Sequence, residues 1–357
     1  MGNGVAILSS VSHDLEDAAA VDERLDEFFA KRLVHARQLG AAFTALWEQV
    51  HEATRGGKRI RPALVTSTHR AFGGAEHEAA VEVAVAFELL HTAFLMHDDV
   101  IDDDTIRRGR PNLVGAFRAQ ALHRGESAAF AWAQAAGILA GDLLIHAAQG
   151  LVAAAALQPA QRRLLLELME ESLAVTAAGE LADVGLTTGV LPPVLPEVLA
   201  MSDAKTAHYS FRAPLRAGAI IAGAADSVLA ALDDYGRHAG TAFQLRDDLL
   251  GVFGRFTDMG KSTSSDLRRA TMTPLVAYAL QTSFRDALLE ALGRDGAVSN
   301  EAEARRLLEV SGARAAVEDL VAEHVAAAQA ALSDLSIPRA LREHLGEVAE
   351  VAGGRMR

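Results

Sequence analysis

The chain has 357 residues, 50% hydrophobic and 23% charged, which is enough to bury a large core and lies near the upper size limit of one domain. Its formal net charge of −13 disfavours a general nucleic-acid or anionic-membrane surface, so any anion must bind at a local site. The sequence has no cysteine, which excludes disulfides and cysteine-ligated metals and fits a reducing cytoplasm.

Apolar residues recur three and four positions apart along most of the chain, whereas alternating β-branched runs are nearly absent. This pattern predicts an all-α fold. The predicted helices, in chain order, cover residues 18–50, 60–72, 75–104, 112–123, 126–157, 160–184, 195–224, 226–254, 272–293, 301–311 and 314–331. The connections between them are short, so we expect one large helical domain over residues 1–357. About the first fifteen residues and the last five are expected to be mobile.

The N-terminus lacks a basic start followed by a long apolar run, so we expect no targeting signal. The most apolar stretches lie around residues 79–96 and 143–157. Polar residues interrupt both of them, and we therefore predict no transmembrane segment.

Two short basic segments occur in this acidic chain. The first is Gly56-Gly57-Lys58-Arg59-Ile60-Arg61-Pro62, and the second contains Arg107, Arg108 and Arg110. Arginine forks match phosphate oxygens in pairs, and glycine lets the backbone approach an anion closely. Solvated surface charge is the alternative for each segment alone, although the flanking glycines and proline favour a shaped anion site in the first.

Five carboxylates lie within seven residues at the end of an apolar helix: Asp98, Asp99, Asp102, Asp103 and Asp104. Residues four apart share a helix face, so Asp98 stacks on Asp102 and their repulsion favours a bound cation. Magnesium prefers such oxygen ligands and commonly joins them to substrate phosphates. A solvated acidic helix end is the alternative interpretation.

A second aspartate pair, Asp247 and Asp248, lies in the apolar segment FQLRDDLL at residues 243–250. Carboxylate pairs among core-like residues are seldom left uncompensated, so we expect the two pairs to share one metal site. Together with the basic segments, they predict two phosphorylated groups beside an apolar cavity, as ionisation of an allylic diphosphate requires. His91 lies two helical turns before Asp98 and could donate to a phosphate, although a buried structural histidine is the alternative.

At these residues the sequence closely resembles the trans-isoprenyl diphosphate synthase (polyprenyl synthetase) family. The resemblance covers roughly residues 50 to 275, and ordered motifs at this density are specific where one alone would not be. Its motifs are GGKRIRP at 56–62, ELLHTAFLMHDDVIDDDTIRRGRPN at 88–112, ILAGDLL at 138–144, GELAD at 179–183, KT at 205–206, FQLRDDLLG at 243–251 and GKSTSSDL at 260–267.

The resemblance implies a helical bundle of the isoprenoid synthase type with a central cavity, usually as a homodimer. It implies three magnesium ions with substrate bound, two held by Asp98 and Asp102 and the third by Asp247, with Asp99 and Asp248 completing the two motifs. The allylic diphosphate would be bound by Arg107, Lys205, Gln244 and Lys261. Isopentenyl diphosphate would be bound by Lys58, Arg61, His91 and Arg108.

The same resemblance implies a mechanism in which the allylic C–O bond breaks and the isopentenyl double bond attacks the carbocation. The Thr206 hydroxyl and the Lys205 carbonyl would direct their dipoles at this cation. Water must be excluded, and the polar segment Arg255 to Leu267 is a candidate lid.

Three positions depart from the family pattern. Gly251 stands where the second motif usually ends in aspartate, Glu180 stands where glutamine is usual, and a basic residue is missing around residues 270–272. These departures weaken the allylic side of the site more than the isopentenyl side.

Bulky residues one turn before Asp98 are expected to form the floor under the growing chain. Ala93 opens one side of this floor and Phe94 blocks the other, which predicts the twenty-carbon product geranylgeranyl diphosphate. Ordinary core packing is the alternative for both residues. Two other functions stay open, a terpene cyclase-like enzyme and a catalytically weak regulatory subunit of a heteromeric synthase.

Overall fold

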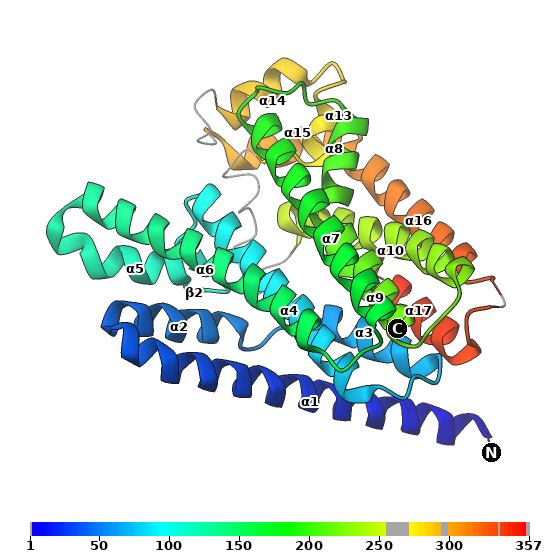
Figure 1. Ribbon diagram of the computed structural model, residues 1–357. Coiled ribbons are helices and arrows are strands. Elements are labelled where there is room, and N and C mark those ends of the chain that lie inside the picture. The colour runs from blue at the N-terminus through cyan, green and yellow to red at the C-terminus, as the bar shows by residue number, and fades with distance from the viewer. Residues whose placement is uncertain (1, 255–270, 294–298, 335, 355–357) are drawn as a thin grey trace. The chain divides into compact units, whose positions relative to one another are not determined.

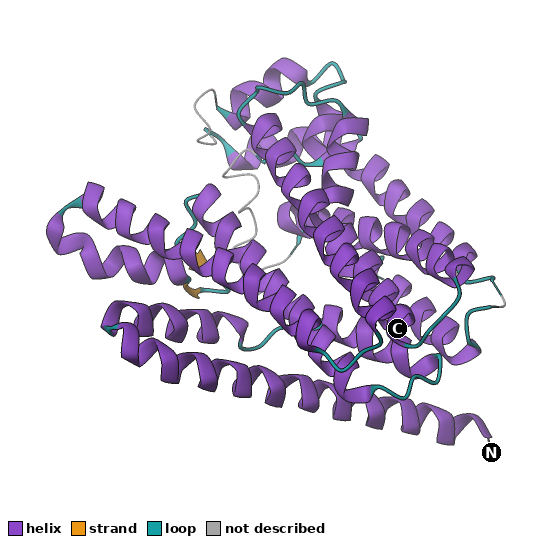
Figure 2. Ribbon diagram, viewed as in Figure 1, coloured by secondary structure: helices purple, strands orange, loops and turns teal. Residues whose placement is uncertain are grey.

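The computed structural model describes residues 2–254, 271–293, 299–334 and 336–354, with side chains described from residue 16 onward. Almost all of this part of the chain is helical, and its β-structure consists of one short two-stranded hairpin (Figure 2). The all-α prediction is therefore confirmed. The backbone of residues 2–15 belongs to a helix, and the predicted mobility of the two chain ends stays a prediction.

The chain divides into two compact units. Unit 1 comprises Met1–Met169 and Pro214–Ala225, and unit 2 comprises Glu170–Ala213 and Asp226–Arg357. One domain over the whole chain stays a prediction.

Unit 1 is built around α4, an apolar helix that packs on α3 and α6. Its core includes the fully buried side chains of Phe29, Phe87, Phe117 and Leu144. Its elements are α1 (Gly2–Leu39), α2 (Ala41–Thr54), α3 (Ile60–Ala71), α4 (His77–Ile101), β1 (Ile106–Arg107), β2 (Arg110–Pro111), α5 (Leu113–Ala121), η1 (Leu122–Arg124), α6 (Glu126–Ala154), the first part of α7 (Pro159–Thr187) and α9 (Ala213–Ile221).

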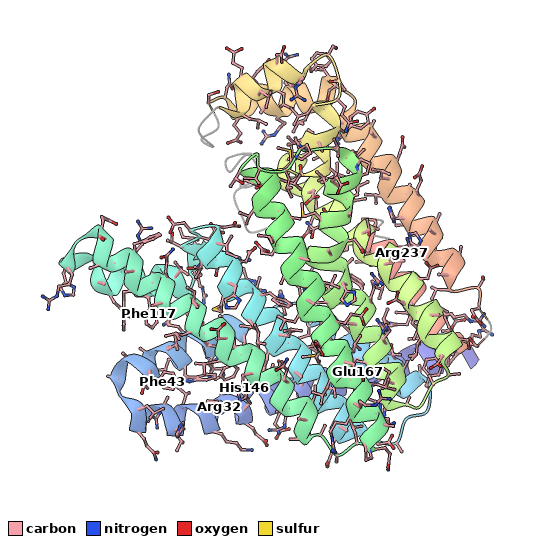
Figure 3. The ribbon with its side chains drawn as sticks, turned by 45° about the horizontal axis from the view of Figure 1, so that its top comes forward. Arg32, Phe43, Phe117, His146, Glu167 and Arg237 are labelled. Atoms are coloured by element: carbon pink, nitrogen blue, oxygen red, sulfur yellow. The ribbon has the colours of Figure 1, made fainter. Side chains whose placement is uncertain are left out.

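Helices α1 and α2 lie antiparallel and side by side (Figure 1). The Arg32 guanidinium of α1 lies 6.0 Å from the Trp47 ring, and Phe43 of α2 meets the same ring edge-on at 6.3 Å (Figure 3). One predicted helix over 18–50 is wrong here, because Gly40 adopts φ 120° and breaks it into α1 and α2. A left-handed φ of this kind favours glycine, which has no Cβ.

Unit 2 is built around α10, which packs on η2, α16 and α17. The Tyr235 hydroxyl of α10 donates to the Leu345 carbonyl of α17 at 2.8 Å, and complete burial raises the pKa of Tyr235. The elements of this unit are the rest of α7, α8 (Leu195–Ser202), η2 (Asp203–Arg212, a π-helix), α10 (Asp226–Phe253), α13 (Pro274–Ala279), α14 (Arg285–Leu292), α15 (Glu301–Val310), α16 (Ala313–Ala331) and α17 (Arg339–Ala352).

Two sequence predictions for unit 2 are wrong in detail. The predicted helix over 272–293 is two helices, because the chain turns between Leu280 and Phe284 with hydrogen bonds such as Thr282 N–H to the Ala279 carbonyl. Helix α17 was not predicted, although its buried face repeats at Leu341, Leu345 and Ala349. That spacing is the signal that could have revealed it.

Two described helices, α4 and α6, are long and apolar enough to cross a membrane by length and composition. The apolar stretch of α4 is 78% buried inside the fold, as in the core helix of a globular protein, whereas that of α6 is 39% buried. The expected absence of a transmembrane segment is therefore supported for α4 and stays a prediction for α6.

Candidate active site

The first aspartate motif lies at the C-terminal end of α4. The backbone N–H of Asp104 donates to the Asp99 carbonyl at 2.8 Å, and Asp103 takes the left-handed conformation with φ 50°. This arrangement is a Schellman motif with aspartate at the position usually held by glycine. A helix C-terminus carries partial negative charge, so the clustered carboxylates repel both one another and the helix end. A divalent cation would relieve this repulsion, and the oxygen donors suit magnesium.

Arg107 pairs with the first two carboxylates of this motif, and Arg118 pairs with Asp103 at 3.3 Å. The Arg107 guanidinium lies 3.0 Å from Asp98 Oδ2 and 2.6 Å from Asp99 Oδ1. Asp99 is completely buried, which raises the pKa of its carboxyl group, and Arg107 offsets part of that rise. The structure thus gives Asp99 a structural partner, while Asp98 and the exposed Asp102 lie closer to solvent.

A tight hairpin carries Arg107 to this position. Strands β1 and β2 pair Arg107 with Arg110, and the two turn residues, Arg108 and Gly109, have φ 53° and 73°. Positive φ at both positions is typical of a two-residue type I′ turn. The side chain of Arg108 lies over the glycine loop, where its Nη2 is 3.2 Å from the position that a Cβ of Gly57 would occupy.

The predicted isopentenyl diphosphate residues gather in unit 1. His91 lies among Arg61, Arg107 and Arg108, and desolvation together with these positive charges holds the pKa of His91 well below its ordinary value. His91 is therefore neutral at physiological pH and can donate one N–H to an anion. Lys58 is exposed on the adjoining loop.

The two predicted chain-length residues differ in burial. Ala93 is fully buried in the core of unit 1, whereas Phe94 is half-buried, as are His91 and Asp98. Phe94 thus follows the helix face that carries the predicted site, because residues 91, 94 and 98 repeat at helical spacing.

Unit 2 holds the second aspartate motif on α10. Asp247 is exposed, whereas Asp248 is buried and accepts a hydrogen bond from Gln244 Nε2 at 2.9 Å. Because Gln244 and Asp248 are four residues apart, they lie on one face of the helix. The structure therefore leaves Asp247 as the accessible carboxylate of this pair.

Lys205 is the charged centre of a second cluster in unit 2. Its ammonium lies 2.6 Å from Asp183 Oδ2 and 3.0 Å from Glu180 Oε2, both on α7. Lys205 and Thr206 belong to the π-helix η2, and such widened turns often occur at functional sites. A side chain on Gly179 would collide with the Lys205 backbone, so the glycine permits the close approach of α7 to η2.

Sequence reasoning overlooked Asp183 as a site residue. The segment GELAD at 179–183 contains it, and its place four residues after Gly179 puts it on the face that meets Lys205. Lys261 and the candidate lid Arg255 to Leu267 lie outside the described residues. The two aspartate motifs belong to different units, so their convergence on one metal site stays a prediction.

A histidine pair joins α10 to α16. The Nδ1 atoms of His238 and His324 are 3.0 Å apart, so one ring donates and the other accepts when both are neutral. Burial and the neighbouring His238 lower the pKa of His324 to about 4, and burial and Arg237 lower that of His238. Protonation of the accepting Nδ1 would break this hydrogen bond, because that nitrogen would then carry a proton of its own.

Acid is therefore expected to destabilise unit 2 before carboxylates titrate. In the unfolded chain a histidine has a pKa of about 6.5, so it binds a proton as the pH is lowered from 7 to 5, whereas His324 in the folded protein stays neutral. The free energy of unfolding therefore falls over this pH range. The lowered pKa of His324 alone should reduce the free energy of unfolding by about 1 to 2 kcal/mol between pH 7 and pH 5. Urea unfolding at both pH values measures the loss, which His324→Gln should reduce and the exposed-site control His123→Gln should leave unchanged. An equal loss in all three proteins would contradict the assignment.

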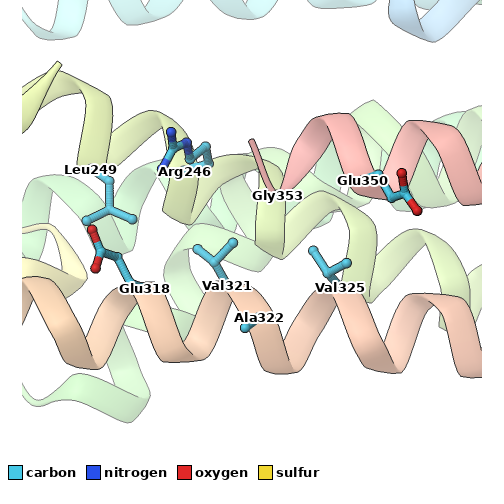
Figure 4. Close-up of a pocket in the computed structure, with 8 residues that line it drawn as sticks. All are labelled: Arg246, Leu249, Glu318, Val321, Ala322, Val325, Glu350 and Gly353. Carbon is cyan, nitrogen blue, oxygen red and sulfur yellow. The ribbon is translucent and has the colours of Figure 1, made fainter. Parts of the chain in front are cut away.

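One cavity of about 120 Å³ lies in unit 2. Arg246 of α10, Val321 and Val325 of α16, and Glu350 of α17 line it (Figure 4). Its lining also includes Glu318, and two carboxylates beside one guanidinium do not suit a diphosphate. This cavity is accordingly distinct from the predicted substrate site, although Arg246 adjoins Asp247 in the sequence.

The chain is similar in sequence to known isoprenyl diphosphate synthases. It is 35% identical to a short chain isoprenyl diphosphate synthase of Methanothermobacter thermautotrophicus over 317 residues, covering 86% of this chain and 89% of the relative. It is 33% identical to a geranylgeranyl diphosphate synthase of Sulfolobus acidocaldarius, covering 70% and 72% of the two chains.

Among solved structures, it resembles a geranylgeranyl pyrophosphate synthase of Corynebacterium glutamicum complexed with isoprenyl diphosphate and magnesium. The TM-score is 0.87 at 28% identity, and the match covers 95% of this chain and 98% of that one. The polyprenyl synthetase family model matches residues 44–310, which include the two aspartate motifs and the basic segments. The chain therefore belongs to the polyprenyl synthetase family of prenyltransferases.

Proposed function

We propose that this polyprenyl synthetase condenses isopentenyl diphosphate with an allylic diphosphate and releases geranylgeranyl diphosphate. The observation that carries the proposal is the arrangement within unit 1. A cluster of carboxylates ends α4, and Arg61 and Arg108 lie near the neutral His91 on the same helix, with Arg107 adjoining both groups. A synthase needs both sites, whereas a cyclase needs no second diphosphate pocket.

The carboxylates of the two aspartate motifs would hold the metal ions. Asp98 and Asp102 would hold magnesium in unit 1, and Asp247 would hold it in unit 2, with three ions in all. When bound, magnesium neutralises charge on the departing diphosphate. Asp98 also forms a 3.0 Å ion pair with Arg107, which holds the Arg107 side chain in place.

The basic residues position the two substrates. Arg61, Arg108 and Lys58 would hold isopentenyl diphosphate, with a hydrogen bond from neutral His91. Arg107, Lys205, Gln244 and Lys261 would bind the allylic diphosphate. The Thr206 hydroxyl and the Lys205 carbonyl would stabilise positive charge on the allylic carbon.

We further propose that the protein acts as a soluble cytoplasmic homodimer. The acidic net charge of −13 keeps copies of the chain soluble, and the absence of cysteine fits a reducing compartment. Size-exclusion chromatography with light scattering would give the oligomeric state directly.

Product length gives the sharpest test of the proposed activity. The full chain is incubated with magnesium, isopentenyl diphosphate and primers of five, ten or fifteen carbons, and products are identified by mass spectrometry. We expect a twenty-carbon product from each primer. Ala93→Phe is expected to shorten it, because an added ring raises the floor of the chain pocket.

Stability must be measured beside product length in this variant. Ala93 is fully buried, so the larger ring could instead overpack the core at a cost of about 1 to 3 kcal/mol. An unchanged product with a lowered melting temperature would refute the floor assignment. A wild-type chain that turns over only with a second protein would favour the regulatory subunit.

A further inference from the structure

Arg59 lies in the middle of the basic loop, and its guanidinium is bound by groups of the protein itself. Its Nη1 donates to Glu88 Oε1 at 2.7 Å and to the Thr54 carbonyl at 2.8 Å, and its Nε donates to Asp22 Oδ1 at 2.9 Å. The Arg59 side chain is only 13% exposed. Its charge is thus used within the protein, unlike that of the exposed Lys58 on the same loop.

The backbone around Arg59 requires such an anchor. Gly56, Gly57 and Arg59 have φ values of 76°, 91° and 50°, so three of four consecutive residues occupy the left-handed region. Glycine adopts this region freely, but arginine does so at a cost, because its Cβ crowds the backbone. Helix α3 begins at Ile60, directly after this turn, so the conformation of Arg59 sets the direction in which Lys58 and Arg61 leave the loop.

The anchoring carboxylates come from two other helices. Glu88 lies on α4, three residues before His91, and its side chain is 9% exposed. Asp22 lies on α1 and is 56% exposed. A buried charged hydrogen bond contributes more to position than an exposed ion pair, so Glu88 is the main anchor and Asp22 a lesser one.

We infer that Glu88 is a positioning residue for substrate binding. It holds Arg59, and through Arg59 it fixes the loop that presents Lys58 and Arg61 to a diphosphate. Glu88 also balances one positive charge in a region where Arg59, Arg61, Arg107 and Arg108 all lie near His91. Without Glu88 the Arg59 side chain is released among these cations. The inference rests on the proposed role of this pocket in binding isopentenyl diphosphate.

Steady-state kinetics on the full chain test the inference, with magnesium and each diphosphate varied in turn. Glu88→Gln keeps the size of the side chain and removes its charge. We expect the KM for isopentenyl diphosphate to rise about tenfold, because small displacements of binding groups have large effects. The KM for the allylic diphosphate should change less than twofold, roughly the scatter of such measurements. Asp22→Asn should raise the isopentenyl KM by a smaller factor.

Glu82 supplies a matched control on the same two helices. Glu82 Oε1 of α4 accepts a hydrogen bond from Arg24 Nη2 of α1 at 2.9 Å, away from the basic loop. Glu82→Gln therefore removes the charge from a tie between α1 and α4, as Glu88→Gln does at Arg59, but leaves the Arg59 contacts unchanged, and both KM values should stay at the wild-type level. Equal rises in the Glu82→Gln and Glu88→Gln variants would mean that helix docking, and not the loop, is responsible.

A second readout does not depend on activity. The loop carries Arg55, Lys58 and Arg59, so brief trypsin treatment of the native protein reports how firmly the loop is held. We expect faster cleavage here in Glu88→Gln than in the wild type or Glu82→Gln. Unchanged cleavage and unchanged KM would overturn the inference. Faster cleavage in a chain whose wild type does not condense these substrates would instead overturn the proposed function alone.

Discussion

Replacing Asp98 by alanine is expected to reduce turnover on the order of a thousandfold while leaving the metal-free protein folded. Removing a carboxylate from the negative end of α4 relieves repulsion with Asp99 and Asp102, although it also breaks the 3.0 Å ion pair with Arg107. These effects oppose each other, and Arg107 keeps its ion pair with the buried Asp99, so no buried charge is left without a partner and the unfolding free energy should change by about 1 kcal/mol or less. Initial rates at saturating magnesium and urea unfolding of the apo-protein measure the two quantities.

Asp103 provides the matched control within the same cluster. It occupies the left-handed position after the helix and pairs with Arg118 at 3.3 Å on the surface. Asn tolerates that conformation, so Asp103→Asn removes one negative charge with little backbone strain. It should retain most of the wild-type rate. If it lost as much activity as Asp98→Ala, general charge and not a specific ligand position would explain the cluster. A collapse of apo-protein stability in Asp98→Ala would point to a structural carboxylate.

Helical periodicity predicted most of the fold, because the buried face of an amphipathic helix appears in the sequence as apolar residues three and four positions apart. It failed where the backbone departs from regular geometry. Gly40 looked like one more small residue within a helix, and the π-helix η2 shares the apolar spacing of the α-helices beside it. Breaks of this kind depend on local hydrogen bonds and tertiary packing, which spacing alone does not encode.

The residue types of the candidate site were predictable, but their partners were not. Asp98 and Asp99 look equivalent in the sequence, yet the structure buries Asp99 against Arg107 and leaves Asp98 more accessible. Arg59 and Arg61 look equally suited to a phosphate, yet Arg59 is bound to Glu88. Such distinctions arise from contacts between residues far apart in the chain, which one sequence does not reveal.

Lys205→Met is expected to lower both turnover and stability. The ammonium lies within 3.0 Å of Glu180 and 2.6 Å of Asp183, whose side chains are 19% and 15% exposed. Methionine keeps the aliphatic stem but leaves two mostly buried carboxylates facing each other without that cation. The unfolding free energy should fall by about 3 kcal/mol, since breaking a buried ion pair leaves uncompensated charge. Urea unfolding and initial rates are measured on the same preparation.

Glu180→Gln separates the structural role of Lys205 from its catalytic role. As a single change it leaves the pair of Lys205 with Asp183 intact and removes one negative charge, so the KM for the allylic diphosphate should fall. Added to Lys205→Met, it removes the repulsion between the two carboxylates and should restore part of the lost stability. The double variant should still lack activity, because glutamine supplies no cation for the diphosphate. Recovery of turnover together with stability would show that Lys205 serves only to balance Glu180 and Asp183, and that the allylic diphosphate is bound elsewhere.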